Sequence, residues 1–129
     1  SARSQMAEGL LRGLAGKTYE SFSAGTEKTR VNPFAIQAMS KRGFDISEHQ
    51  SEHIDSFMER DIDYVITVCD NANETCPYFP TNNHRMHWSF SDPSATKGTD
   101  AEILAAFEVT RDLIEKRLET FIAENAHAQ

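Results

Sequence analysis

The 129-residue sequence has little cysteine and a shortage of basic residues, and both limit what the chain can do. Lysine and arginine number 13 against 20 aspartates and glutamates, which gives a formal net charge of −7. Such a balance disfavours nonspecific nucleic-acid binding, which needs a basic field, and it repels small anions at long range. A site for an anion must therefore be built locally, from helix ends and individual arginines.

Long apolar runs are missing as well. No stretch approaches the roughly 20 apolar residues of a membrane-spanning helix, and no secretory signal pattern is visible. The length, with 39% hydrophobic and 26% charged residues, fits one compact domain over residues 1–129. Two cysteines do not make a disulfide scaffold, so we expect the reducing cytoplasm as the natural setting.

The two cysteines that are present, Cys69 and Cys76, are the most informative feature of the chain. Cys69 follows the apolar run 63–68, and the polar segment 70–75 separates it from Cys76. Four-ligand metal sites favour closer spacing and further ligands nearby, so we expect no metal here. The pattern indicates redox chemistry, and two buried structural thiols remain the alternative.

The spacing of these thiols makes a physical prediction. Seven residues along a helix rise about 10.5 Å, whereas a disulfide needs Cα atoms within about 7 Å. Cys69 and Cys76 therefore cannot bond while the intervening segment is helical, and they can bond if it unwinds. Asn, Asp and Thr there are weak helix formers, and Pro77 limits helix extension. We hypothesise a redox switch that is helical when reduced and looped out when oxidised.

The hydrophobic pattern predicts helices alternating with strands. Helical spacing of apolar residues predicts helices over 4–15, 33–42 with Asn32 as its cap, a short one within 51–58, and a long one over 100–124. Strand patterns cover 19–24, 64–69 and 85–88. This alternation predicts an α/β fold, with a parallel sheet covered on both faces and any ligand at one edge.

Motifs spread along the whole chain resemble a known family. They are Ser1-Ala2-Arg3-Ser4-Gln5-Met6-Ala7-Glu8-Gly9, Phe22-Ser23-Ala24-Gly25, Val31-Asn32-Pro33, Asp45-Ile46-Ser47, Val65-Ile66-Thr67-Val68-Cys69, Cys76-Pro77, His87-Trp88 and Ser91-Asp92-Pro93. Together they resemble the thioredoxin-coupled arsenate reductases, which belong with the low-molecular-weight protein tyrosine phosphatases. The resemblance implies a three-layer fold in which helices flank a four-stranded parallel sheet of order 2-1-3-4.

The chain departs from this family at its start. The family's phosphate loop is a Cys, five residues and an Arg, so if Arg3 is that Arg the nucleophilic Cys lies four residues before Ser1. The family's first strand, central between those matching 19–24 and 64–69, is missing too. We therefore expect an N-terminally incomplete domain that cannot perform the covalent step. Unpaired strand edges also lead us to expect dimers, strand exchange or poor stability.

The resemblance assigns roles to individual residues at the oxyanion site. It implies that Arg3 and the loop amides around Ser1, Ala2 and Ser4 hold arsenate, because a guanidinium fork matches a tetrahedral oxyanion. Asp92 corresponds to the general acid that protonates the departing oxygen. An ordinary turn is the alternative reading of Asp92 when the resemblance is set aside.

The resemblance also implies a thiol relay. Cys69 attacks the arseno-cysteine formed by the upstream thiolate, Cys76 then attacks Cys69, and thioredoxin reduces the resulting Cys69–Cys76 disulfide. No cofactor is implied. Three further positions, Glu8, Ser23 and Glu52, correspond to potassium-binding positions of some relatives, but a solvated acidic surface is the favoured interpretation.

Two other functions remain open. A tyrosine phosphatase of the same fold would use Arg3 and Asp92 but would not need Cys69 and Cys76. Such phosphatases tend to carry a Tyr after the Asp-Pro pair, where this chain has Ser94. A protein without the nucleophile could also be a non-catalytic remnant that binds oxyanions or a partner. The two cysteines and Ser94 favour arsenate reduction.

Overall fold

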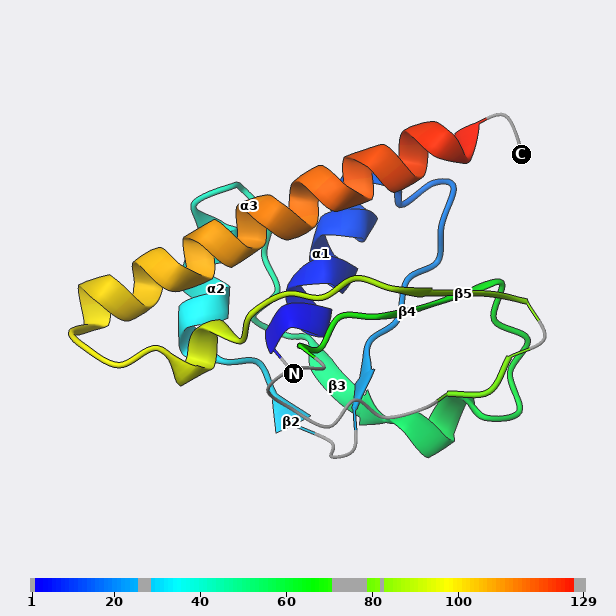
Figure 1. The fold of residues 1–129 in the computed structure, drawn as a ribbon, viewed down its shortest axis with the longest axis horizontal. Coiled ribbons are helices and arrows are strands. Elements are labelled where there is room, and N and C mark those ends of the chain that lie inside the picture. Colours follow the sequence, from blue (N-terminus) through cyan, green and yellow to red (C-terminus); the bar gives the residue numbers. More distant parts are fainter. Residues whose placement is uncertain (1, 26–28, 71–78, 82, 127–129) are drawn as a thin grey trace.

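The computed structural model describes residues 2–25, 29–70, 79–81 and 83–126. Its helices are α1 (Ala2–Ala15), α2 (Pro33–Ser40) and α3 (Asp100–Glu124), with two 3₁₀ turns, η1 (Ile54–Phe57) and η2 (Pro93–Ala95). Its strands are β1 (Ala24–Gly25), β2 (Thr29–Arg30), β3 (Gln50–His53), β4 (Tyr64–Thr67) and β5 (His84–His87). Figure 1 shows α3 running along the whole length of the molecule. In this part of the chain no helix is both long and apolar enough to cross a membrane.

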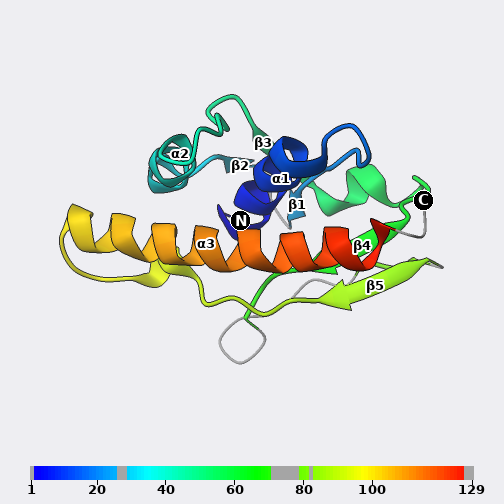
Figure 2. The same cartoon turned by 90° about the horizontal axis from the view of Figure 1, so that it is seen from above.

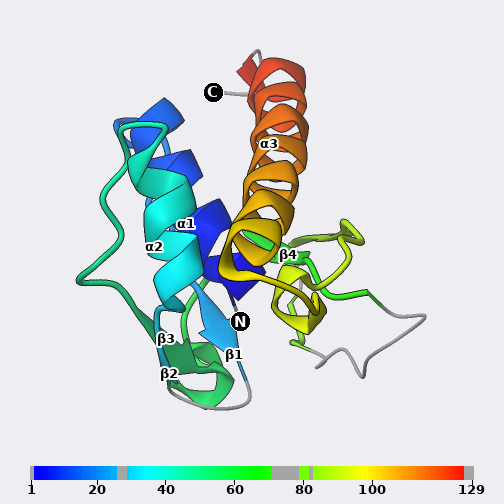
Figure 3. The same cartoon turned by 90° about the vertical axis from the view of Figure 1, so that its left-hand side faces the viewer.

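The described strands form two separate sheets. One has the order β1-β3-β2, with β1 parallel and β2 antiparallel to β3. The other is the parallel pair β4-β5, in which Tyr64 lies opposite His84. The two sheets lie apart in Figure 3. The α/β class, with helices and parallel strands, is therefore confirmed, but the predicted four-strand count and the order 2-1-3-4 are not.

The helices predicted over 4–15 and 33–42 and the strand predicted over 85–88 are observed with ends shifted by one or two residues. Three other predicted segments also differ from the observed elements. The strand predicted over 19–24 contributes only Ala24 to β1, since alternation without a hydrogen-bonded neighbour does not make a strand. The helix predicted within 51–58 is instead β3 followed by η1. The strand predicted over 64–69 ends as β4 at Thr67, two residues before Cys69.

Local capping residues determine where the helices begin. The Oδ1 atom of Asn32 accepts a hydrogen bond from the backbone N–H of Phe34 at 2.8 Å, and Pro33 fills the first helical position of α2. Gly43, with φ of 83°, reverses the chain after α2. Thr99 and Glu102 form a reciprocal capping box at the start of α3, whose predicted bounds are confirmed.

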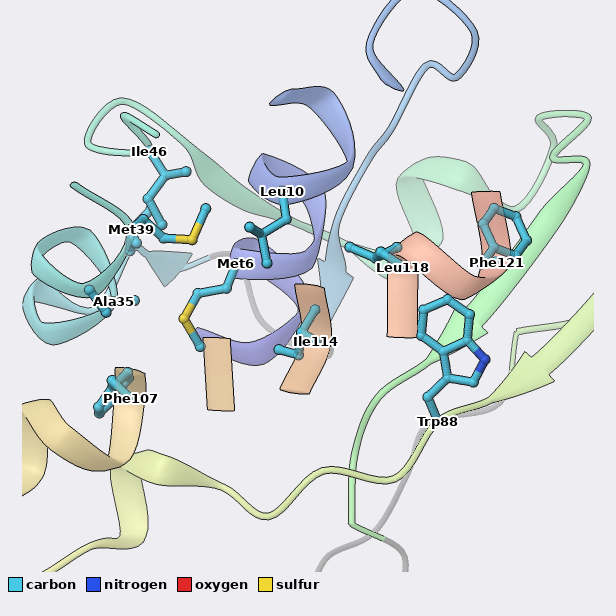
Figure 4. Packing of buried hydrophobic residues seen from close by; sticks show 12 residues of the cluster. Met6, Leu10, Ala35, Met39, Ile46, Trp88, Phe107, Ile114, Leu118 and Phe121 are labelled. Atoms are coloured by element: carbon cyan, nitrogen blue, oxygen red, sulfur yellow. The ribbon is translucent and has the colours of Figure 1, made fainter. Parts of the chain in front are cut away.

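The core is organised by α3, which packs against α1 and α2. Figure 2 shows α3 lying between these two helices and the strands β4 and β5. The ring of Phe121 meets Tyr64 at 5.1 Å and Trp88 at 5.8 Å between centroids, both edge-on. Figure 4 shows side chains from all three helices meeting in one cluster. Its buried members are Met6, Leu10, Val31, Ala35, Ala38, Met39, Ile46, Trp88, Phe107, Ile114, Leu118 and Phe121.

Truncating Ile114 tests this assignment of the core. Its side chain is fully buried, whereas the neighbouring Leu113 is 53% exposed on the same helix. We expect Ile114→Ala to lower the free energy of unfolding by about 2–5 kcal/mol, and Leu113→Ala to change it by less than about 1 kcal/mol. Urea denaturation of both variants measures the difference. If both variants lost the same free energy of unfolding, the assignment of Ile114 to the buried face of α3 would be wrong.

The capping box predicts a pH dependence of stability. The backbone N–H and hydroxyl of Thr99 donate to the Glu102 carboxylate and hold the pKa of Glu102 below its ordinary value of 4.5. This contribution is present above the ordinary pKa and is lost as the pH falls through the lowered one. We expect Glu102→Gln to reduce the melting temperature more near pH 7 than near pH 2. When Thr99 is also replaced by Ala, the loss of melting temperature caused by Glu102→Gln should differ less between pH 7 and pH 2.

Candidate functional site

The candidate site lies where the start of α1 meets the segment that follows β5. The strands β4 and β5 are parallel, so their carboxyl ends lie at the same edge. The N–H of Trp88 donates to the carbonyl of Thr67 at 2.8 Å and continues the pairing by one residue. Cys69 and Asp92 therefore both follow strand ends at one edge of this sheet, as the sequence predicts for a ligand site.

Arg3 joins α1 to this edge. Its side chain is only 2% exposed, yet it comes from the first turn of the helix. The Nη1 atom donates to the carbonyl oxygen of Phe90 at 2.8 Å, and Nη2 lies 3.7 Å from Oδ2 of Asp92. The structure thus brings together the predicted oxyanion-binding arginine and the predicted general acid.

Asp92 is held by its own turn. Its Oδ1 atom accepts from the backbone N–H of Ser94 at 3.0 Å and from the Ser94 hydroxyl at 2.7 Å, which caps η2. Its other oxygen faces Arg3, and the side chain is 37% exposed. The carboxyl group is therefore both fixed in direction and accessible to a reacting molecule.

The same turn chemistry occurs in a second place. Asp45 accepts from the N–H of Ser47 at 2.9 Å and from its hydroxyl at 2.7 Å. The side-chain hydrogen bond from Ser47, followed by the one from its backbone, lowers the pKa of Asp45. Asp45 has no arginine partner among the described contacts, so the pairing with a buried guanidinium distinguishes Asp92 from an ordinary Asp-x-Ser turn.

The arrangement of Arg3 and α1 suits a tetrahedral anion. The first amides of a helix have no acceptor within that helix, and the helix dipole favours negative charge there. Ala2, Arg3 and Ser4 all belong to this first turn of α1. A buried guanidinium beside helix amides is an environment in which an oxyanion is stabilised without reorganisation of the protein.

Only part of the predicted thiol relay can be placed. Cys69 is half-buried, lies two residues after the end of β4, and is disulfide-bonded. Ser1 and Cys76 lie outside the described residues, as does nearly all of the segment predicted to switch between helix and loop. The redox switch therefore stays a prediction, and the structure places only Cys69, just beyond the carboxyl end of β4.

The structure changes the interpretation of Glu8, Ser23 and Glu52. All three line one pocket of about 550 Å³. The Glu8 side chain is only 9% exposed and Ser23 only 5%, so the predicted solvated acidic surface is wrong for these two residues. Within the described ranges, no group of three or more His, Cys, Asp or Glu residues is arranged to hold a metal ion.

Sequence reasoning misses Phe90 and the partners of Glu8. Phe90 acts through its backbone carbonyl, which no side-chain pattern reveals. Glu8 is paired with Arg12 at 3.2 Å and with Nδ1 of His49 at 3.1 Å. The i,i+4 spacing of Glu8 and Arg12 on a predicted helix could have indicated the first contact, but His49 comes from a distant segment.

The chain is similar in sequence and in structure to known proteins. The profile of the family described as low molecular weight phosphotyrosine protein phosphatase matches residues 1–129. An arsenate reductase of Halalkalibacterium halodurans is 46% identical over 121 residues, covering 94% of this chain and 87% of that protein. An arsenate reductase solved in its oxidised state matches with a TM-score of 0.78 and 34% identity, covering 95% of this chain and 89% of the other. A thioredoxin-dependent arsenate reductase of Corynebacterium glutamicum has a TM-score of 0.64 and 25% identity, covering 95% of this chain and 57% of its own.

Two substitutions separate the structural from the chemical role of Asp92. Asp92→Asn keeps an acceptor for Ser94, and we expect the free energy of unfolding to change by no more than about 0.5 kcal/mol. Asp92→Ala removes that acceptor and should cost about 1 kcal/mol. Urea denaturation measures both. An asparagine variant as unstable as the alanine variant would mean that the contact with Arg3, and not the turn, carries the stability.

Proposed function

Because this chain belongs to the low molecular weight phosphotyrosine protein phosphatase family, we propose that it reduces arsenate to arsenite as part of arsenic detoxification. One observation carries the proposal: a buried arginine and a directed carboxyl group meet at the sheet edge that Cys69 follows. The arginine and the acid suit an oxyanion, and Cys69, once its disulfide is reduced, suits the reduction. Relatives that are named arsenate reductases support the same chemistry.

We propose that Arg3 binds arsenate and that Asp92 assists the first step. A thiolate attacks arsenic, an oxygen leaves as Asp92 supplies a proton, and a covalent arseno-cysteine forms. The guanidinium of Arg3 would offset the negative charge of the oxyanion throughout this step, and its position 3.7 Å from Asp92 supports the proposal. The amides of the first turn, at Ala2, Arg3 and Ser4, and those at Ser1 complete the proposed binding loop.

The reduction itself is proposed to pass through two further thiols. Cys69 attacks the sulfur of the arseno-cysteine, the new S–S bond forms, and the electron pair of the broken As–S bond leaves with arsenic as arsenite. Cys76 then attacks the Cys69 sulfur and releases the first thiolate. That Cys69 is disulfide-bonded in the structure supports its participation in thiol exchange.

We propose thioredoxin as the dithiol that reduces the final disulfide, and the cytoplasm as the compartment. A thioredoxin-dependent arsenate reductase is among the similar solved structures, which supports this reductant. The relay consumes two electrons per arsenate and returns the protein to its dithiol form only when a partner supplies them. A reducing compartment maintains such a partner.

We further propose that the covalent step needs a first thiol and a strand between β1 and β4 in addition to the described residues. Two features of the described residues support this. Neither β1 nor β4 is paired with the other, although the family order places one strand between them. Arg3 also lies at the very start of α1, where the family loop would end. Unpaired edges at β1 and β4 would favour dimers or strand exchange.

A phosphatase is the second candidate, since the matching family profile carries that name. Arg3 and Asp92 would serve phosphate ester hydrolysis equally well. The observation against it is at Ser94, whose hydroxyl bonds to Asp92 at 2.7 Å where an aromatic side chain would grip a phenyl substrate. A role without catalysis, as an oxyanion-binding remnant, is the third.

The deciding experiment compares two reactions in a chain extended by an upstream strand and a Cys six residues before Arg3. We expect thioredoxin-dependent arsenate reduction by the extended chain and none by residues 1–129 alone. Cys69→Ser should lower this reduction by at least about 10²-fold while leaving the melting temperature within a few degrees, because it removes a reacting sulfur. Reduction is measured as oxidation of NADPH coupled through thioredoxin reductase.

The control is the hydrolysis of p-nitrophenyl phosphate by the same proteins. Strong phosphatase turnover that survives Cys69→Ser, without arsenate reduction, would select the phosphatase. Oxyanion binding by the extended chain without either reaction would select the non-catalytic role. The variant Arg3→Lys should weaken both reactions, since an ammonium cannot bind two oxygens in the plane of a fork.

A further inference from the structure

A hydrogen-bonded pair of side chains lies at the carboxyl end of the two parallel strands. Thr67 is the last residue of β4 and His87 is the last residue of β5, and the strand register places them side by side. The Oγ1 atom of Thr67 lies 2.6 Å from Nδ1 of His87. The His87 side chain is exposed, so its ring is open to a neighbouring reactive group.

The hydrogen bonds of this pair leave one nitrogen of the His87 ring as a proton acceptor. The Thr67 hydroxyl also donates to the carbonyl oxygen of Met86, at 3.5 Å. A hydroxyl oxygen that donates to that carbonyl accepts from Nδ1–H of the imidazole. In this tautomer Nε2 of His87 carries the lone pair that can take up a proton.

Strand alternation places Cys69 on the same face of the sheet as this pair. Tyr64 packs against α3, so Thr67, three positions later, projects to the opposite face. Val68 is only 8% exposed, which shows that the alternation continues into the residues before Cys69. Two residues along a strand span about 7 Å and neighbouring strands lie about 4.8 Å apart, so the ring of His87 is within reach of the Cys69 sulfur.

The charged groups around the pair leave the imidazole as the group that can accept a proton near neutral pH. Arg85, two residues before His87 on the same face of β5, donates to a backbone carbonyl at 3.1 Å, and Asp70 follows Cys69 directly. Further along the same edge, Arg3 and Asp92 face each other at 3.7 Å. The helix α3 packs on the opposite face of the strands. A guanidinium cannot take up a proton, and a carboxylate does so only at acidic pH.

We propose that His87 is the proton acceptor that ionises the Cys69 thiol once its disulfide is reduced, and that Thr67 is a positioning residue that holds the ring. The inference rests on the proposed thiol relay, in which Cys69 attacks as a thiolate. The proton of the thiol moves to Nε2 of His87, the electron pair stays on sulfur, and the imidazolium returns the proton to solvent. An unassisted thiol, with a pKa of about 8.5, is only a few per cent ionised at pH 7.

Alkylation of a single thiol tests the proposal without arsenate. In a Cys76→Ser chain reduced with a water-soluble phosphine, the rate at which iodoacetamide modifies Cys69 is measured from pH 5 to pH 10. We expect His87→Gln to lower this rate about threefold or more at pH 7, because less thiolate is present. At pH 10, where the thiol ionises without help, the two rates should agree within about 1.5-fold.

Two further substitutions serve as controls. His84→Gln is the matched control, because His84 lies on the same strand but stacks on Tyr64 at 5.1 Å, on the face toward α3. It should leave the pH profile unchanged. Thr67→Val removes the hydroxyl and should shift the profile in the same direction as His87→Gln, whereas Thr67→Ser should keep the original profile. Thr67→Val also tests the contact if His87→Gln does not fold.

Three results would overturn the proposal. They are an unchanged profile in His87→Gln, an equal fall of the rate at pH 7 and pH 10, which would indicate altered access to the thiol, and an equal effect of His84→Gln. None of them depends on arsenate. If the extended chain failed to reduce arsenate, the proposed function would be rejected while the alkylation result stood, and an unchanged alkylation profile would reject only the role of His87.

Discussion

A buried guanidinium needs partners for its charge and its N–H groups, and at Arg3 this requirement holds the candidate site together. Arg3 is 2% exposed and is bound to the Phe90 carbonyl and to the Asp92 carboxylate. Loss of the Phe90 contact would leave a guanidinium N–H unpaired in the interior, which is unfavourable. The Asp92 carboxylate is 3.7 Å away and 37% exposed, so its contribution to stability is smaller. The same group that is suited to bind an oxyanion therefore also fixes the start of α1 against the segment after β5.

The pair of Arg3 and Asp92 is common to two chemistries, so it does not by itself decide between them. Oxyanion binding and proton donation serve the hydrolysis of a phosphate ester as well as the first step of arsenate reduction. The difference lies in the thiols, because only reduction needs sulfur atoms that accept and pass on electrons. One scaffold thus supports either activity, and residues placed at the ends of its strands select the reaction.

The sequence predicts the helices better than the strands. It predicts the bounds of α3 because that helix carries a long apolar stripe, and it predicts the start of α2 from Asn32 and Pro33. The pattern over 19–24 fails as a strand because pairing depends on partners far away in the chain. For the same reason β3 is missed, since Gln50–His53 carries no apolar alternation and is a strand only through β1 and β2.

In the candidate site, too, residues with a local sequence motif are predictable, and residues that act through distant contacts are not. Arg3 and Asp92 are identified from motifs, and the structure brings their side chains to 3.7 Å. The roles of Phe90 and His49 are not predictable in this way. One acts through its backbone, and the other reaches Glu8 across 41 positions of sequence.

The position of α3 determines how the molecule comes apart. The two sheets share no described strand pairing, and α3 contacts the helices beside one sheet and the aromatic residues of the other. Opening of this helix would therefore expose both halves in one cooperative event, while fraying of a single sheet would leave the other intact. The slowest amide hydrogen exchange should then be found in the middle of α3, with the amides of β1 and β2 exchanging through local openings of lower free energy.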